Sequence, residues 1–342
     1  MWGTMGFMYN PENVDAEDVK DWKVLENEKY HKKSTLKNSV RDTYFYALAC
    51  VYQDELQALA SQLEDASITK AEYAAALNEI MNRTDQQSVD KAREYLREIK
   101  KSVYGFEVDS GKNDMVTGKI DLNFCWSGDA AYGIWEADDE NGFTLAYSVP
   151  ELVSNVWFDG WVIPKGGNRS LAEKFLNFIS LPENAMLNMD YIGYTSVIAG
   201  EEIYSDYVEG GYAVEEEGEE LQALLDAGEA MEYDVSYFFK EEGDSTEYTF
   251  YAYTEDMQGM LLAQYPTEEI VQRCVIMQYF DEAGNNRINM MWEDVKGAAV
   301  PLGAVIFIGV IVLVLLGVFL ISNYGYEWFK PRPKKGYYKV EK

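Results

Sequence analysis

A carboxylate between two indole rings is the arrangement in this sequence that most suggests binding chemistry. Residues 155–164 have the aromatic and β-branched content of a β-strand, and Pro164 ends it. Because successive side chains of a strand point to opposite faces, Trp157, Asp159 and Trp161 would share one face. An ammonium group that pairs with a carboxylate and lies over an indole gains about 0.5–2 kcal/mol per cation–π contact. A core strand with one capping or hinge aspartate explains the same pattern, and the stretch alone favours that explanation.

Catalytic and metal chemistry have little support. His31 is the only histidine, which removes His-based triads and HExxH-type metal sites. Cys50, Cys125 and Cys274 show no CxxC spacing, so neither a disulfide framework nor a zinc site is indicated. No phosphate-binding or nucleophile-elbow motif is present, and we expect no cofactor and no metal. An enzyme with paired carboxylates is an alternative, but no acidic residue is singled out with a partner.

The composition fits a folded binding protein. The chain has 342 residues, enough for two domains or one large α/β unit. The formal net charge of −30 argues against nucleic acid as a partner, because phosphate needs Lys and Arg. The charge is compatible with a cationic ligand, although a solvated acidic surface explains most of it.

The C-terminal part predicts a membrane anchor. The 24 residues from Ala298 to Ile321 carry no charge. As a helix they would reach about 36 Å, and a bilayer core needs about 30 Å. We therefore predict a transmembrane helix at 298–322. The basic tail at 323–342 then lies in the cytoplasm and the main domain outside the cell or in the periplasm. Because Met1 opens no secretory signal, we expect export information upstream or a chain cut from a longer one.

Strands and helices alternate along the chain, which predicts an α/β architecture. Residues 201–262 differ, because they are rich in Glu, Tyr and Gly, and we expect an insertion there. The main elements expected are a helix at 41–63, a strand at 120–126, a hairpin of 231–239 with 247–253, and helices at 267–279 and 282–296.

An ordered set of short motifs resembles the spermidine/putrescine-binding proteins of polyamine ABC importers. No single motif is specific, but their order and spacing are family-like over about residues 1–200, and more weakly over 264–296. Met1–Asn10 is similar to the hinge strand of that family, and Ser39–Asp42 falls where the family has an acidic D-x-R-E motif. The other motifs are Asp109–Ser110, Cys125–Ala130, Trp157–Asp159, Ile163–Gly166 and Tyr191–Tyr194.

The resemblance implies a type II periplasmic-binding-protein fold, with two α/β lobes and a ligand cleft that closes about a hinge. In the family the first lobe begins upstream of the hinge strand, so we expect a fold that lacks part of this lobe. The expected divisions are a second lobe with hinge strand (1–158), a segment returning to the first lobe (159–200), the insertion (201–262), C-terminal helices (263–297), the transmembrane helix (298–322) and the tail (323–342). An uncovered apolar helix face would result.

The resemblance also implies ligand contacts. Ser39 stands where the family has aspartate, so one anionic contact is lost, and the last family contact near Met277 or Gln278 stays unassigned. The expected ligand contacts are Trp126 and Trp157 as aromatic walls, Asp159 and Asp42 as amine ligands, Ser110 as a hydrogen-bond partner, and Ser39 at the position of the missing aspartate.

The implied function is the extracytoplasmic substrate-binding component of an ABC importer for polyamines. Such a protein captures a cation for the permease subunits and catalyses no reaction. One alternative is the same fold with another cationic or small organic solute, which the serine at position 39 supports. Another is a membrane-anchored surface interaction protein, suggested by the Tyr/Glu-rich insertion.

Overall fold

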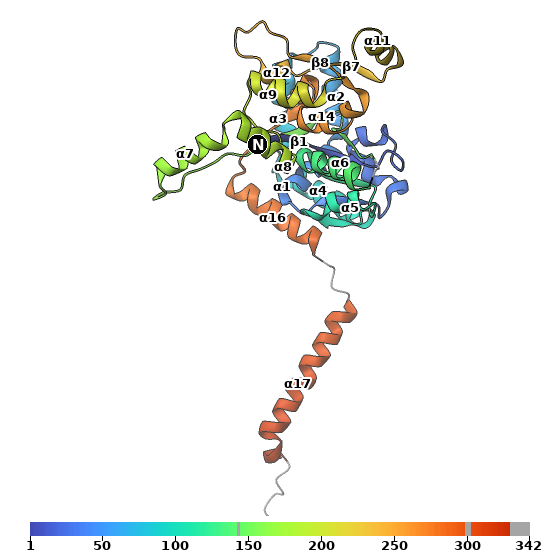
Figure 1. The fold of residues 1–342 in the computed structure, drawn as a ribbon. Coiled ribbons are helices and arrows are strands. Elements are labelled where there is room, and N and C mark those ends of the chain that lie inside the picture. Colours follow the sequence, from blue (N-terminus) through green and yellow to red (C-terminus); the bar gives the residue numbers. More distant parts are fainter. Residues whose placement is uncertain (142–143, 298–301, 329–342) are drawn as a thin grey trace, which may run out of the picture. The chain divides into compact units, whose positions relative to one another are not determined.

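The computed structural model describes residues 1–141, 144–297 and 302–328. It forms two units, residues 1–295 and 296–342. The first unit is built on a seven-stranded mixed sheet with helices around it, so the predicted α/β architecture is confirmed (Figure 1). The strand order is β3-β2-β4-β1-β6-β9, and β5 also pairs with β1. The strands are β1 (Trp2–Tyr9), β2 (Ser34–Lys37), β3 (Gly105–Glu107), β4 (Leu122–Trp126), β5 (Ala146–Ser148), β6 (Ser154–Phe158) and β9 (Cys274–Val275).

Strand β1 is the centre of this sheet, and all of its residues are buried. Residues 5–9 pair antiparallel with β4, and residues 2–4 pair antiparallel with β6. Gly3 is required where these strands meet, because a Cβ there would collide with Ser127 Oγ and lie 2.8 Å from the Trp157 ring. The start of β1 therefore lies tightly against Ser127, which follows β4, and against the Trp157 ring of β6.

Helices pack around this sheet. The predicted helix at 41–63 is two helices, because the chain bends at Tyr52 (φ −110°, ψ 17°), whose hydroxyl hydrogen-bonds Ser88 Oγ at 2.7 Å. The helices before residue 200 are α1 (Val40–Val51), α2 (Gln53–Glu64), α3 (Lys70–Met81), α4 (Gln86–Ser102), α5 (Ser110–Val116), α6 (Ser127–Asn141), α7 (Arg169–Ile179) and α8 (Pro182–Ile192). Three short 3-10 helices, Asp18–Lys20, Trp22–Glu26 and Glu28–Tyr30, follow β1.

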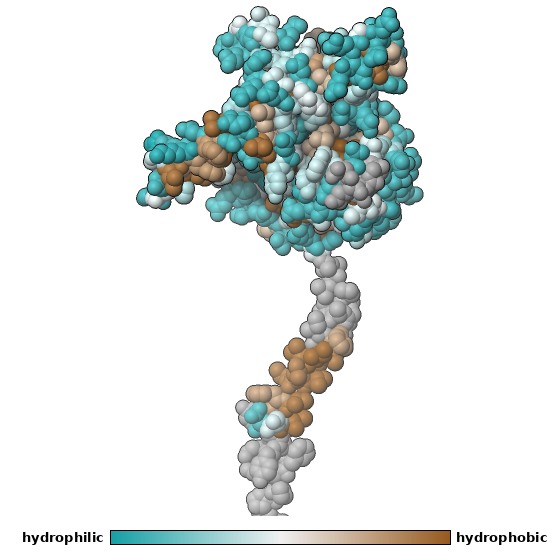
Figure 2. Space-filling view, in the orientation of Figure 1, coloured by the Kyte–Doolittle hydropathy of each residue, from teal (hydrophilic) through white to brown (hydrophobic). Residues whose placement is uncertain are grey.

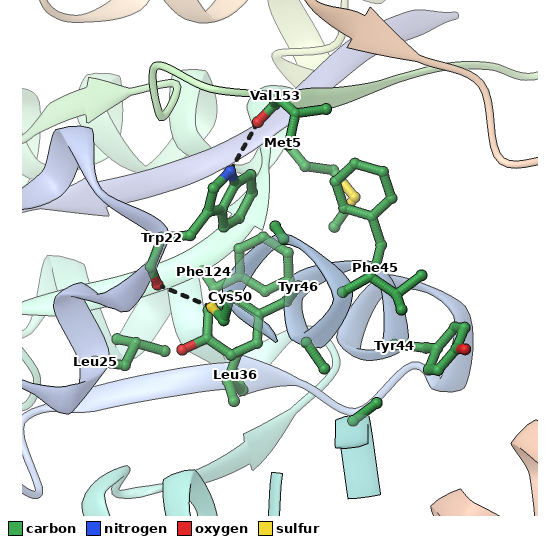
Figure 3. Packing of buried hydrophobic residues seen from close by; sticks show 14 of the residues in the cluster. Met5, Trp22, Leu25, Leu36, Tyr44, Phe45, Tyr46, Cys50, Phe124 and Val153 are labelled. Carbon is green, nitrogen blue, oxygen red and sulfur yellow. Dashed lines mark hydrogen bonds between the residues drawn. The ribbon is translucent and has the colours of Figure 1, made fainter. Parts of the chain in front are cut away.

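The main core lies between the sheet and helices α1 to α4, and Trp22 is at its centre (Figure 3). The indole nitrogen of Trp22 donates to Val153 O at 2.7 Å, which satisfies the polar atom of a ring that is 2% exposed. Phe45 and Phe124 meet this ring edge-on. Cys50 is buried beside it as a free thiol, and burial raises its pKa to about 12.

Residues 201–262 build a second, aromatic core. Strands β7 (Ala230–Asp234) and β8 (Thr249–Tyr253) pair antiparallel, so the pairing of the predicted hairpin is confirmed. Its predicted first strand, 231–239, is too long, because residues 236–239 form a helix. Phe238 of this segment stacks on Trp2 of β1, with ring centroids 5.3 Å apart and planes 15° apart. The segment therefore packs on the start of the central strand. Its helices are α9 (Glu201–Ile203), a π-helix (Tyr204–Glu209), α10 (Gly210–Tyr212), α11 (Gly218–Ala227), α12 (Ser236–Phe239), α13 (Thr254–Met257) and α14 (Met260–Gln264).

The predicted helix at 267–279 is wrong. Helix α15 (Glu268–Gln272) is short, and the chain then forms β9, which pairs parallel with β6. Strand β6 needs a partner on the edge away from β1, and the side chain of Asn155 reinforces the pairing by donating to Val275 O at 2.9 Å. The predicted last helix is confirmed as α16 (Glu282–Lys296).

Helix α7 projects from the body of the first unit and has no buried residue (Figure 1). Its apolar residues Leu171, Phe175 and Phe178 are 64%, 49% and 58% exposed. The same arm carries a brown, apolar surface in Figure 2. The expectation of an uncovered apolar helix face is therefore confirmed.

The second unit contains α17 (Leu302–Trp328). Among the residues that the structure describes, no helix combines the length and the apolar character that crossing a bilayer requires. The predicted span at 298–322 is thus not confirmed. Residues 298–301 of that span and residues 329–342 of the predicted tail lie outside the described residues.

Candidate functional site

A cavity of about 570 Å³ opens where the ends of β4 and β6 meet the start of α1. Four of the six predicted contact residues line it: Asp42, Trp126, Trp157 and Asp159. The remaining lining residues are Asn155, Val156, Phe158, Tyr194, Ile276 and Met277. The structure thus gathers residues from five separate stretches of the chain, including the unassigned neighbourhood of Met277.

Strand β1 brings the two indoles together. Trp126 pairs opposite Met5 on one edge of β1, and Trp157 pairs opposite Gly3 on the other edge. Both therefore lie near the same end of the central strand. The Trp157 indole nitrogen is buried without a hydrogen-bond partner among the described residues. An aromatic wall with a free donor suits a ligand that is part apolar and part polar.

Asp42 is the buried carboxylate of the cavity. It lies in the first turn of α1, and the hydroxyl of the capping residue Ser39 accepts from its backbone N–H at 3.5 Å. Burial raises the pKa of Asp42, although Ser39 and the positive charge of Lys37 act in the opposite direction. Ser39 does not line the cavity. The structure places it as a neighbour that orients Asp42.

Asp159 is the exposed carboxylate of the cavity. It follows β6 directly, and its backbone N–H donates to Met1 O at 2.8 Å. Trp161 does not share this face, contrary to the sequence prediction. Strand β6 ends at Phe158, where pairing with β1 ends at Trp2, so the alternation of a strand stops there. Trp161 is 70% exposed and packs edge-on against Phe175 of α7.

Ser110 is not among the residues that line the cavity. It is exposed at the first position of α5, three residues after the end of β3. Strand β3 is at one edge of the sheet, separated from β1 by β2 and β4. The sequence carried no information on this strand order.

Charged residues behind the two indoles had no predicted role. Asp129 accepts from Lys37 Nζ at 3.1 Å and from the Tyr194 hydroxyl at 3.0 Å. Lys37 lies over the Trp126 ring at 4.4 Å, and the Tyr194 ring lies 5.6 Å from that of Trp157. Asp129 therefore connects both walls. Asp129 and Tyr194 occur in the motifs that resemble the polyamine-binding family. No sequence pattern indicated a role for Lys37.

The protonation states of this network follow from burial and charge. Burial alone would lower the pKa of Lys37, but Asp129 and Glu107 more than compensate, and the net pKa is raised. Burial and the Asp129 carboxylate raise the pKa of Tyr194, so its hydroxyl stays protonated and donates. Lys37 is thus a permanent buried cation next to the cavity.

The chemistry of the lining favours an organic cation. It contains two carboxylates and two indoles and no Lys or Arg. Within the described part of the chain, no group of three or more His, Cys, Asp or Glu is placed to hold a metal ion. The arrangement can pair ammonium groups with carboxylates and cover an alkyl chain with aromatic rings.

Comparison with protein families gives one match over the N-terminal part. The family described as "Bacterial extracellular solute-binding protein" matches residues 1–204. Among curated proteins, the spermidine/putrescine-binding periplasmic proteins of Salmonella typhimurium and Escherichia coli (strain K12) are each 23% identical over 195 residues. These alignments cover 57% of this chain and 47% of each relative, so the chain spans about half the length of the curated relatives it matches.

Solved structures share the fold. The substrate-binding protein of a spermidine/putrescine ABC transporter from Streptococcus pneumoniae matches with a TM-score of 0.52 and 21% identity. A lipoprotein of Treponema pallidum matches with a TM-score of 0.54 and 16% identity. Both alignments cover 86% of this chain and 67% of the other.

Proposed function

Because this chain belongs to the family of bacterial extracellular solute-binding proteins, as its sequence motifs predicted, we propose that it captures a polyamine outside the cytoplasm for an ABC permease. Proteins of this family bind and release a solute, so the expected role is binding and not catalysis. The single observation that carries the choice of ligand is the cavity, which is lined by Asp42, Asp159 and two indoles and by no Lys or Arg. The names of the curated relatives support the same ligand class.

Each lining residue has a proposed role. Trp126 and Trp157 cover the methylene chain of the ligand, and each contributes about 0.5–2 kcal/mol where it also faces an ammonium. Asp42 and Asp159 each pair with one ammonium. Ser39 acts through Asp42, by capping the helix turn that holds this carboxylate.

The proposed domain organisation keeps the divisions expected from the sequence. Strands β1 and β6 are the crossover strands, so residues 1–158 form the second lobe and 159–200 return towards the first. The insertion at 201–262 packs on Trp2 of β1 and braces the hinge. Residues 263–297 complete the solute-binding domain.

Anchoring of the chain in the membrane is also a proposal. Its support is the uncharged run from Ala298 to Ile321, followed by the basic residues of the tail. A tethered receptor would keep the captured amine close to the permease.

A different cationic solute is the second candidate. The observation that favours it is Ser39, a neutral residue where the resembling family has an aspartate. This candidate keeps the cavity and its carboxylates and changes only the length or charge of the ligand.

Thermal melting of the full chain with added ligands tests the proposal. Putrescine and spermidine should raise the melting temperature, because they bind the folded state. The matched control is 1,4-butanediol, which has the carbon chain of putrescine without its charges and should have no effect. An equal shift with the diol, or no shift with any amine at millimolar concentration, contradicts amine recognition. A shift with other organic cations alone supports the second candidate.

A further inference from the structure

Lys37 is a buried ammonium whose surroundings match those of a bound amine. Its side chain is 1% exposed at the end of β2. Its Nζ contacts Glu107 Oε1 at 3.2 Å, Asp129 Oδ2 at 3.1 Å and Val108 O at 2.9 Å. These are three acceptors for three ammonium hydrogens. We call the position formed by Glu107, Asp129 and Trp126 the Lys37 site.

The Lys37 site and the cavity share one wall. The Trp126 ring lies 4.4 Å from Lys37 Nζ and also lines the cavity. Two carboxylates and an indole form the Lys37 site, and two carboxylates and two indoles occur in the cavity. The protein therefore places its own amine in a position built from the same groups.

Each carboxylate of the Lys37 site already accepts from three donors of the protein. Glu107 also accepts from Gly111 N at 2.8 Å and from Asn123 Nδ2 at 3.1 Å. Asp129 also accepts from Lys112 Nζ at 3.1 Å and from Tyr194. In contrast, neither Asp42 nor Asp159 forms a salt bridge among the described residues. Asp42 and Asp159 are therefore the carboxylates of the cavity that a bound amine can neutralise.

We propose that Lys37 is a specificity-determining residue, which fills one amine position beside Trp126 so that the cavity selects a diamine over a triamine. This inference rests on the proposed function. Putrescine carries two ammonium groups and matches Asp42 and Asp159 one to one. The third ammonium of spermidine meets no carboxylate of this cavity without an amine partner, because Lys37 already occupies the position between Glu107 and Asp129.

Calorimetry with putrescine and spermidine on the full chain tests this selection. The wild-type protein should bind putrescine more tightly. Lys37→Met removes the internal cation and frees Glu107 and Asp129, so the affinity ratio should move towards spermidine by about tenfold or more. Lys119→Met is the matched control, because Lys119 pairs with Asp114 on the surface at 2.9 Å and contacts no cavity residue. The control should keep the wild-type ratio.

The outcomes separate this inference from the proposed function. An unchanged ratio in a folded Lys37→Met protein overturns the role of Lys37 and leaves amine binding intact. If that variant does not fold, the wild-type protein decides, because tighter binding of spermidine than of putrescine also overturns the inference. Absence of binding of both amines to the wild type contradicts the proposed function itself, and the inference with it.

Discussion

The hydroxyl of Tyr194 donates to the carboxylate of Asp129 at 3.0 Å. Tyr194 lines the cavity, whereas Asp129 is buried behind it and also holds Lys37. The Asp129 carboxylate thus accepts from Lys37, which contacts the Trp126 ring, and from Tyr194, which contacts the Trp157 ring. Asp129, which does not line the cavity, therefore links residues that contact both indole walls.

Tyr194→Phe should loosen this connection without removing the ring. The lost hydrogen bond to a charged group is worth about 1.5–3 kcal/mol of unfolding free energy. We expect a lower midpoint in urea denaturation and a several-fold weaker affinity for putrescine. Tyr191→Phe is the control, because Tyr191 is 83% exposed and should change neither quantity. Equal effects of the two substitutions would contradict a role of the Tyr194 hydroxyl in stability and binding.

Asp159→Asn should weaken amine binding and leave folding intact. The substitution keeps the shape and removes a charge that is exposed in the free protein. Loss of one charged hydrogen bond costs about 1.5–3 kcal/mol, or roughly 10- to 150-fold in affinity. Calorimetry should show this loss at an unchanged melting temperature. Asp226→Asn serves as the control, because Asp226 lies in α11 and does not line the cavity. If Asp159→Asn binds the amine as tightly as the wild type, Asp159 is a structural cap and not a ligand contact.

Trp157→Leu should cost less affinity than Asp159→Asn. It removes cation–π attraction and wall area but strands no charge, and one such contact is worth about 0.5–2 kcal/mol. Calorimetry of both variants with the same amine shows which of them loses more affinity. The reverse order would assign the main binding energy to the indole.

Asp42 should make stability and binding respond to pH in opposite directions. Its pKa is raised mainly by burial from the ordinary value of 3.8, so the folded state holds the proton more tightly than the unfolded state. The ionised carboxylate therefore destabilises the free protein above the folded pKa, and this cost disappears as the pH falls towards 3.8. Amine binding needs the ionised form and should weaken over the same fall in pH.

Asp42→Asn tests whether the charge of Asp42 destabilises the free protein. The variant should melt at a higher temperature than the wild type at pH 7, the difference should shrink at acidic pH, and amine affinity should fall. Melting curves at several pH values measure the first two effects. A lower melting temperature of the variant at pH 7 would show that the charge of Asp42 stabilises the fold.

The proposed membrane anchor predicts a protease pattern. Protease added to intact cells should degrade the residues before 298 and spare an epitope attached to the C-terminus. The same protease should remove the epitope after the cells are lysed. Loss of the epitope in intact cells would overturn the proposed orientation.

Local patterns predicted the elements that depend on neighbouring residues. The last helix, predicted at 282–296, is α16 (Glu282–Lys296), and the two predicted strands of the insertion pair with each other, although the first one ends at Asp234. The prediction of a helix at 267–279 was wrong because Cys274 and Val275 pair with β6, and this partner strand is distant in sequence. Local propensity contains no information on such a partner.

The candidate site shows the same limit. Asp42, Trp126, Trp157 and Asp159 were predicted from residue type and motif order, and the structure brings them to one cavity, although their ligand roles stay predictions. The ion pair of Lys37 with Asp129 joins residues far apart in sequence, and no spacing rule indicates it.

Titration of the full chain with putrescine, compared with the Asp42→Asn/Asp159→Asn double variant, tests the central claim most directly. The account predicts saturable binding to the wild type that weakens as salt rises, because the contacts are charge-driven. It predicts no measurable binding to the double variant, since both ammonium partners are gone. Equal affinity of the two proteins would contradict the claim that these carboxylates recognise the ligand.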